Sequence, residues 1–366
     1  MSIIIFLIIL AVLVLVHEFG HFIVAKKSGI RVDEFGLGFP PKIFSKKIGG
    51  TLYTLNAIPF GGFVKIFGED PHVEDVPLSE KSGSFYYKPK WIKASVLVAG
   101  VTFNIIFAWL LISLGFMVGL PSPTNHSGFG EVTNVRTMIT EVFPNSPAEK
   151  AGLISGDKII SLSSEGVILE GVNLTPENVQ QTIRENETQD ISITYKRGEN
   201  QPQTVSIIPV TNIIPGSRAI GIAVDSFGIL KLPLHLAIIE GARTTSLLVK
   251  GTVVGLLGFF ADVITLQSDF SQISGPIGIA GVVGEAQSLG FVYLLTLTAL
   301  ISINLAVINL FPFPALDGGR LFFLLIEAII RRPIPGAFVR YANVIGFGLL
   351  ILLMIIVTGH DILKLL

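Results

Sequence analysis

The feature of this chain that most clearly implies chemistry is a pair of histidines with a glutamate beside the first. His17, Glu18 and His21 occur in the run HEFGH. On a helix, His17 and His21 project from one face, one turn apart, and two neutral imidazoles at that spacing can bind one Zn²⁺. Glu18 would then lie close enough to take a proton from an attacking water. The pattern predicts a zinc site with Glu18 as catalytic base.

A catalytic zinc usually has three protein ligands, so a third must come from elsewhere. The chain has no cysteine, which restricts the ligand to His, Asp or Glu. Asp317 is the strongest candidate, within residues 312–320 (PFPALDGGR). The prolines stop a helix, the glycines permit turns, and unwound backbone at membrane depth survives only where protein or a water-filled cavity shelters it. We expect Asp317 to complete the site; an ordinary Asp-Gly turn is the alternative.

The composition indicates that these residues are positioned by membrane helices. Half of the residues are hydrophobic and 14% are charged, against about 25% charged in a soluble domain. The formal net charge is −1, so no basic footprint for nucleic acid is present. We expect an α-helical polytopic membrane protein with the lipid bilayer, and no nucleic acid, as a partner.

Four apolar segments are long enough to span a bilayer, at residues 1–25, 94–120, 289–311 and 341–357. The first could instead be a signal peptide, but it lacks a basic start and a small-residue cleavage site before Lys26. Each ionisable group inside a span costs about 2.5–3.5 kcal/mol on insertion scales. The HEFGH run within the first segment therefore requires a functional reason, unless it lies at the cytoplasmic interface.

Residues 234–264 form a further apolar segment with charges along it. Glu240, Arg243, Lys250 and Asp262 are costly at the centre of a bilayer. We predict an amphipathic helix lying on the membrane, with a fifth span as the alternative.

The polar segments predict β structure and a small inserted domain. Residues 26–93 carry glycine-punctuated apolar stretches such as Thr51–Ile58, typical of strands and turns. Residues 121–230 contain short β-type runs around a helical stretch at 175–185, the content of an α+β module. The predicted parts are 1–120 with the first two spans and the β region between them, 121–230 as the module, 231–288 with the interfacial helix and a loop at 274–279 (SGPIGI), and 289–366 with the last two spans and the loop that carries Asp317.

Basic residues predict the orientation of the chain in the membrane. Eleven Lys and Arg residues lie between 26 and 93, and Arg320, Arg331, Arg332 and Arg340 lie between the third and fourth spans. Both segments should be cytoplasmic. The predicted location is thus a cell membrane, with the HEFGH site toward the cytoplasm and the 121–230 module outside.

Asn304 and Asn309 are polar residues within the third apolar segment. Such amides can hydrogen-bond neighbouring helices together. Alternatively, one of them donates a hydrogen bond to a substrate carbonyl or its oxyanion.

The order of these motifs resembles the bacterial site-2 protease family of intramembrane zinc metalloproteases. The resemblance covers nearly the whole chain. The shared motifs are HEFGH, residues 35–40 (FGLGFP), 58–65 (IPFGGFVK), 274–279 (SGPIGI) and 304–320. In that family residues 35–65 correspond to a membrane-associated β-hairpin near the active site. Val101 stands where relatives often have proline, while Asn104 is retained, and we expect only a packing change there.

The 121–230 module resembles a PDZ domain. Residues 139–153 (ITEVFPNSPAEKAGL) and 156–160 (GDKII) match the PDZ pattern, and PDZ domains bind extended peptide by strand addition. Only one such module fits, whereas some relatives carry two in tandem, so the size-filtering role of a tandem arrangement is in doubt.

The resemblance implies a zinc metalloendopeptidase that cleaves single-span membrane proteins, such as anti-sigma factors or signal-peptide remnants, with peptide tails bound at the PDZ domain. It assigns His17, His21 and Asp317 as ligands of Zn²⁺, Glu18 as base, and Asn304 and Asn309 to substrate. The hairpin could hold an unwound substrate by edge pairing. The alternatives are a catalytically silent PDZ scaffold and a membrane zinc transporter; the hydrophobic spans exclude a soluble zincin.

Overall fold

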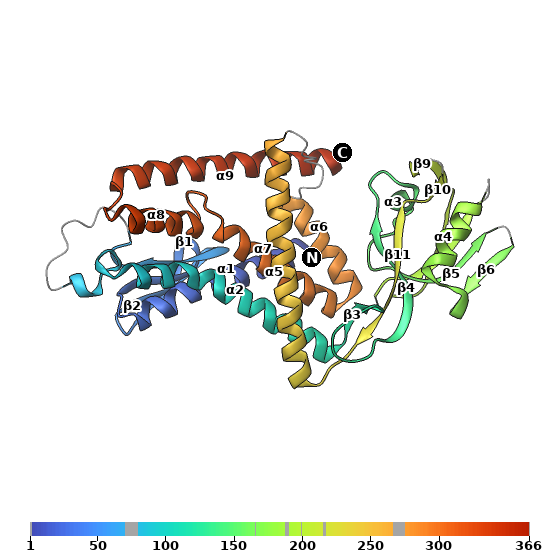
Figure 1. Ribbon diagram of the computed structural model, residues 1–366, viewed down its shortest axis with the longest axis horizontal. Helices are drawn as coiled ribbons and strands as arrows, with labels where there is room; N and C mark the ends of the chain where they lie inside the picture. The colour runs from blue at the N-terminus through green and yellow to red at the C-terminus, as the bar shows by residue number, and fades with distance from the viewer. Residues whose placement is uncertain are drawn as a thin grey trace. The chain divides into compact units, whose positions relative to one another are not determined.

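A computed structural model describes residues 2–69, 80–164, 166–186, 190–198, 200–214, 217–265 and 275–365. The chain forms two compact units (Figure 1). The helical unit comprises Met1–Leu111, Arg243–Val283 and Leu297–Leu366, and the β-rich unit comprises Ile112–Ala242 and Gly284–Thr296. The predicted boundaries at 120, 230 and 288 remain predictions as domain limits.

Five of the described helices are long and apolar enough to cross a membrane. A helix satisfies its own backbone hydrogen bonds, and about 20 residues span the hydrocarbon layer. These helices are α1 (Ser2–Lys27), α2 (Lys90–Val118), α5 (Leu234–Ile264), α7 (Phe291–Leu310) and α9 (Gly336–Leu365). Four of them, α1, α2, α7 and α9, coincide with the four predicted spans, although α7 is slightly shorter than predicted and α2 ends two residues earlier.

The fifth candidate is α5, a single helix of 31 residues. It meets the same criteria of length and composition, so five candidate spans stand where we expected about four. The placement of α5 on the membrane surface stays a prediction. The fourth predicted span is also longer than expected, because α9 begins directly after Pro335 and extends past its apolar centre.

The predicted β-hairpin is confirmed within the helical unit. Strand β1 (Val32–Ile48) pairs antiparallel with β2 (Thr51–Ile66). Gly49 and Gly50 join the strands and have φ of 56° and 84°. A two-residue turn whose twist matches that of the strands requires positive φ at both positions. The hairpin lies alongside α1 (Figure 1). Its base packs with the ends of two helices through a buried apolar cluster of Ala25, Ile30, Val32, Ile66 and Val96.

The β-rich unit confirms the α+β content predicted for residues 121–230. Its largest sheet has the order β3-β11-β4-β5-β7-β8, with β6 paired to β5. The amphipathic helix α4 (Pro176–Glu185) buries Val179 and Ile183 in the core of this unit. Thr175 caps α4 by accepting a hydrogen bond from the Asn178 N–H. The strands are β3 (Leu120–Pro123), β4 (Thr133–Val142), β5 (Lys158–Ser164), β6 (Val167–Glu170), β7 (Ile191–Lys196), β8 (Gln203–Ile207), β11 (Ile222–Leu230) and the separate pair β9 (Val210–Ile214) and β10 (Ser217–Ala219).

The SGPIGI motif, which we predicted as a loop, instead forms the start of α6 (Pro276–Leu289), with Ser274 outside the described residues. A carboxylate more than 80 residues further along the chain caps this helix. Asp361 of α9 is buried and accepts hydrogen bonds from the backbone N–H groups of Gly275, at 3.1 Å, and Gly278, at 2.8 Å. The first backbone N–H groups of a helix have no acceptor within the helix. Asp361 provides an acceptor for two such groups at the start of α6, where a negative charge is also favoured.

Replacing Asp361 with alanine should destabilise the helical unit, because two backbone N–H groups lose a charged acceptor. We expect the free energy of unfolding to fall by about 1–3 kcal/mol, measured by thermal unfolding in detergent. Asp361→Asn keeps one acceptor oxygen and should lose less. Asp262→Ala, which removes an exposed carboxylate of α5, is the control. Equal unfolding temperatures for Asp361→Ala and the control would contradict the capping role.

Candidate metal centre

His17 and His21 lie on one face of α1 and are both buried. Two glycines allow α1 and α2 to approach closely enough to bury them. A Cβ atom on Gly20 would lie 2.5 Å from the carbonyl oxygen of Ala99, and one on Gly100 would lie 2.7 Å from His17 Cε1. The two helices therefore pack closely at these glycines, and Gly100 leaves the space that the imidazoles occupy.

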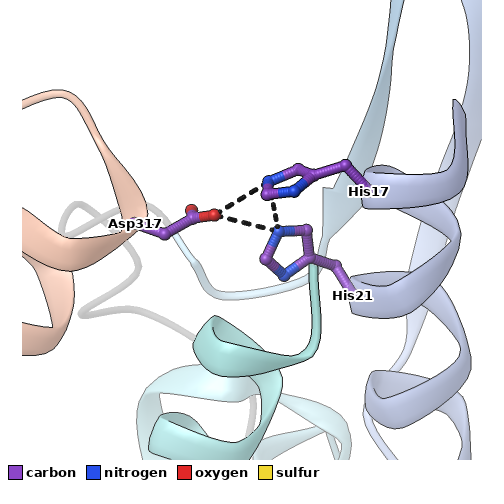
Figure 2. A group of neighbouring side chains, drawn as sticks. All are labelled: His17, His21 and Asp317. Carbon is purple, nitrogen blue, oxygen red and sulfur yellow. Dashed lines mark hydrogen bonds and ion pairs between the residues drawn. The ribbon is translucent and has the colours of Figure 1, made fainter. Parts of the chain in front are cut away.

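Asp317 joins the two histidines from 300 residues further along the chain (Figure 2). Its Oδ2 atom lies 2.9 Å from His17 Nε2 and 3.2 Å from His21 Nε2. The two Nε2 atoms are themselves 3.2 Å apart. Donor atoms of a tetrahedral zinc with bonds of about 2.0–2.1 Å lie roughly 3.3 Å from one another. The three side chains thus have the identity and the spacing of one face of a zinc site.

The glycines after Asp317 have a different role from the one we predicted. Asp317 is the first residue of α8 (Asp317–Ile330), so Gly318 and Gly319 lie in a helix and not in a turn. A side chain on Gly318 would collide with the Leu310 carbonyl. The turn lies before the helix, at Ala315, which has φ of 76°. Close backbone packing, which the sequence does not reveal, explains the glycines.

The position of Asp317 favours its ionised form. Burial raises the pKa of the carboxyl, but the two neighbouring imidazoles more than offset this, and the pKa lies below its ordinary value. The N-terminus of α8 also favours a negative charge. A carboxylate must be ionised to bind a metal.

The histidines are oriented by groups behind their rings. His21 Nδ1 lies 2.8 Å from the Val96 carbonyl. A carbonyl can only accept, so Nδ1 carries the proton there and Nε2 faces Asp317. His17 Nδ1 lies 3.5 Å from the amide nitrogen of Asn104, while the buried Asn104 Oδ1 has no hydrogen-bond partner among the described residues. With the amide oxygen facing His17 in place of the nitrogen, Oδ1 accepts a hydrogen bond from the Nδ1 proton and leaves His17 Nε2 to face the metal.

Glu18 lines a cavity of about 220 Å³ next to these groups. His17, Asp317 and Asn309 also line it. A Cβ atom on Gly62 of β2 would lie 3.9 Å from Glu18 Cγ, so the hairpin approaches the glutamate. The cavity thus brings together two of the three candidate ligands, the Glu18 carboxylate and the Asn309 amide.

The two asparagines of the third apolar segment occupy different surroundings. Asn309 lines the cavity. Asn304 accepts a hydrogen bond of 3.3 Å from Thr252 of α5, which links two helices. This matches the interhelical alternative for Asn304, whose contact with substrate stays a prediction.

Three contributors to the site were not identified as such from the sequence. Val96 contributes a backbone carbonyl, which no side-chain pattern can indicate. Gly100 carries no side chain that could signal a role, and Asn104 appears in the sequence analysis only as a retained motif position. A polar residue buried in an apolar span was the one available signal for Asn104, which is fully buried.

Comparisons with known proteins identify the class to which this site belongs. The model of peptidase family M50 matches residues 5–353. A relative from Clostridium perfringens, named as a candidate zinc metalloprotease, is 36% identical over 363 residues, 99% of this chain and 98% of its own length. The regulator of sigma-W protease RasP from Bacillus subtilis is 29% identical over 440 aligned positions, 100% of this chain and 99% of its own length. Zinc metalloprotease RasP from Geobacillus kaustophilus is 28% identical, with 99% and 98% covered.

The fold, the His-His-Asp cluster and these matches define a membrane zinc metalloendopeptidase. The chain belongs to peptidase family M50, the site-2 protease family. Zinc is therefore its metal.

Asn104→Ala should weaken zinc binding, because His17 loses the group that orients its ring. Mutating a residue that orients a ligand typically costs about 10–100-fold in metal affinity. The measurement is zinc retained by the purified chain against a chelator series, with Thr102→Ala, an exposed change on the same helix, as the control. An unchanged zinc affinity in Asn104→Ala would refute this role.

Proposed function

We propose that this chain cleaves the transmembrane helices of single-span membrane proteins, with His17, His21 and Asp317 holding Zn²⁺ and Glu18 acting as base. The observation that carries the proposal is the cluster itself. Two histidines of the 26-residue apolar helix α1 meet Asp317, and together the three side chains could hold a metal ion. Ionisable groups in such a helix are costly, and catalysis inside the membrane explains their presence.

A zinc ion held by these three side chains would supply the polarisation of the scissile carbonyl and the activation of a water. The side chains of the cavity supply the rest of the chemistry. Glu18 takes a proton from the attacking water and later delivers it to the leaving amine. Asn309, on the same cavity, can donate a hydrogen bond to the carbonyl oxygen as negative charge develops on it. The cavity of about 220 Å³ suits a short stretch of extended backbone, so a helical substrate must unwind to enter.

The β-hairpin is proposed to hold the unwound substrate. Strand β2 approaches Glu18 at Gly62, and an extended peptide can pair with a strand edge. The Gly61 backbone, with φ of 84°, turns the strand at this point.

We further propose that the β-rich unit binds peptide tails as a PDZ domain. Support comes from its α+β content and from the PDZ-like runs at residues 139–153 and 156–160. The distribution of basic residues supports a cytoplasmic position for the metal site and an outer position for the PDZ unit. Sigma-W regulation is stated in the name of one relative and supports an anti-sigma factor as one substrate class. No observation favours a silent scaffold or a zinc transporter.

Glu18→Gln should abolish cleavage while zinc stays bound, because glutamine cannot accept the proton and Glu18 is not among the three clustered ligands. We expect the rate to fall by about a hundredfold or more. The assay follows a single-span model substrate with the full chain in lipid, together with zinc content. Glu131→Gln, at an exposed position, is the control. Cleavage by Glu18→Gln at the rate of the unmodified chain would contradict the role of Glu18 as the catalytic base.

Asn309→Ala should lower kcat at unchanged zinc content, by about 10²–10³ if the amide supports the developing charge. Asn304→Ala is the matched comparison in the same helix. It removes the link to Thr252 and should lower thermal stability more than kcat. A loss of kcat in Asn304→Ala alone would contradict this assignment and would place the substrate contact at Asn304 instead of Asn309.

A further inference from the structure

A second and larger cavity lies within the helical unit, apart from the metal site. Its volume is about 550 Å³, in the range of about 300–1,000 Å³ of small-molecule sites. The walls come from the start of α2, from α8, and from the start of α9. The three candidate metal ligands and Glu18 do not line it. Its occupant is therefore a separate question from the protease activity.

The lining of this cavity is rich in positive charge. Five basic residues face two acidic ones, Glu69 and Glu327. Glu69 is paired with Arg320, and Glu327 Oε1 accepts a hydrogen bond from the Ile334 N–H at 3.0 Å. Five basic residues against two acidic ones leave an excess of positive charge in the lining. The basic residues are Lys90, Lys93, Arg320, Arg331 and Arg332.

The same cavity has an apolar wall. Leu97, Phe323, Leu324 and Val339 line it. Leu97 lies two turns into α2 from Lys90, so the lining of this helix changes from basic to apolar along its length. Such a cavity suits a molecule with an anionic end and an aliphatic end.

The position of the cavity matches a membrane interface. The candidate spans α2 and α9 begin at two of its lining residues, Lys90 and Gly336. A span leaves the hydrocarbon near its first residues, where basic side chains meet lipid headgroups. Basic pockets between membrane helices at this level bind anionic headgroups.

We propose that this cavity binds an anionic phospholipid. The phosphate lies against Lys90, Arg331 and Arg332, since guanidinium groups bind phosphate oxygens through two parallel hydrogen bonds. The upper part of an acyl chain lies against Leu97 and Leu324. A zwitterionic lipid is disfavoured because its own cation would face the basic residues.

The bound lipid would lie against the elements that hold the metal site. Helix α8 begins at Asp317 and forms one wall. Asn343, also in the lining, accepts a hydrogen bond of 3.1 Å from the N–H of Ala315, in the turn before Asp317. Lipid binding should therefore stabilise the loop that presents this ligand.

The test measures lipid binding to the full chain, delipidated in detergent, by native mass spectrometry and thermal unfolding. Phosphatidylglycerol, phosphatidylcholine with the same acyl chains, and inorganic phosphate are compared. We expect saturable binding and stabilisation with phosphatidylglycerol only. Arg331→Gln/Arg332→Gln should weaken that binding about tenfold or more, since each basic residue contributes about 1 kcal/mol near anionic lipid. Lys46→Gln/Lys47→Gln, an exposed pair on β1 outside the cavity, removes the same charge and should leave the affinity unchanged.

Three results would overturn the proposal. Equal binding of the two lipids would remove the role of charge. Equal loss in the two double variants would indicate general attraction to the surface and not this cavity. Saturable stabilisation by inorganic phosphate that phosphatidylglycerol does not exceed would identify a soluble phosphate compound as the ligand in place of lipid. None of these readouts depends on proteolysis.

Discussion

The contact between the Asp317 carboxylate and the two imidazoles of α1 is the interaction on which the rest of the helical unit depends. It joins residues 300 positions apart and satisfies polar groups that would otherwise be costly in an apolar environment. The features around it follow from this requirement. Gly20 and Gly100 permit the close approach of α1 and α2. Gly318 and Gly319 permit the close approach of α8 to the loop before it. The two pairs of glycines together allow the histidines and Asp317 to meet.

The same requirement explains why irregular backbone occurs between two membrane-type helices. The segment from Phe311 to Leu316 separates α7 from α8, and its polar groups need shelter from lipid. Asn343 of α9 provides part of that shelter by accepting the Ala315 N–H. The buried Asp361 carboxylate plays the corresponding part at the start of α6. In both cases a side chain of α9 completes backbone hydrogen bonds of another segment, which makes α9 a structural support for the helices around it.

Much of this organisation could be predicted from local pattern. The long apolar runs predicted α1, α2, α7 and α9, because a bilayer-spanning helix requires about 20 apolar residues in sequence. The alternation of strands and turns predicted the hairpin and the β-rich unit, since turn residues and β-type runs are local signals. Helix α5 shows the limit of such reasoning. Its charges suggested an interfacial helix, while its length and overall composition match those of a span.

For the candidate site, the sequence by itself determined the chemical types: a His-Glu-His run with helical spacing, no cysteine to compete, and an aspartate in a loop rich in proline and glycine. Only the tertiary structure decided that Asp317 reaches both imidazoles, that Asn309 faces the cavity while Asn304 bonds to Thr252, and that Asn104 and Val96 lie behind the rings. The physical reason is that spacing along a helix sets which side chains share its face. Contact between helices depends on how closely their backbones pack and on which face each helix turns toward its neighbour. Both are set by the whole fold.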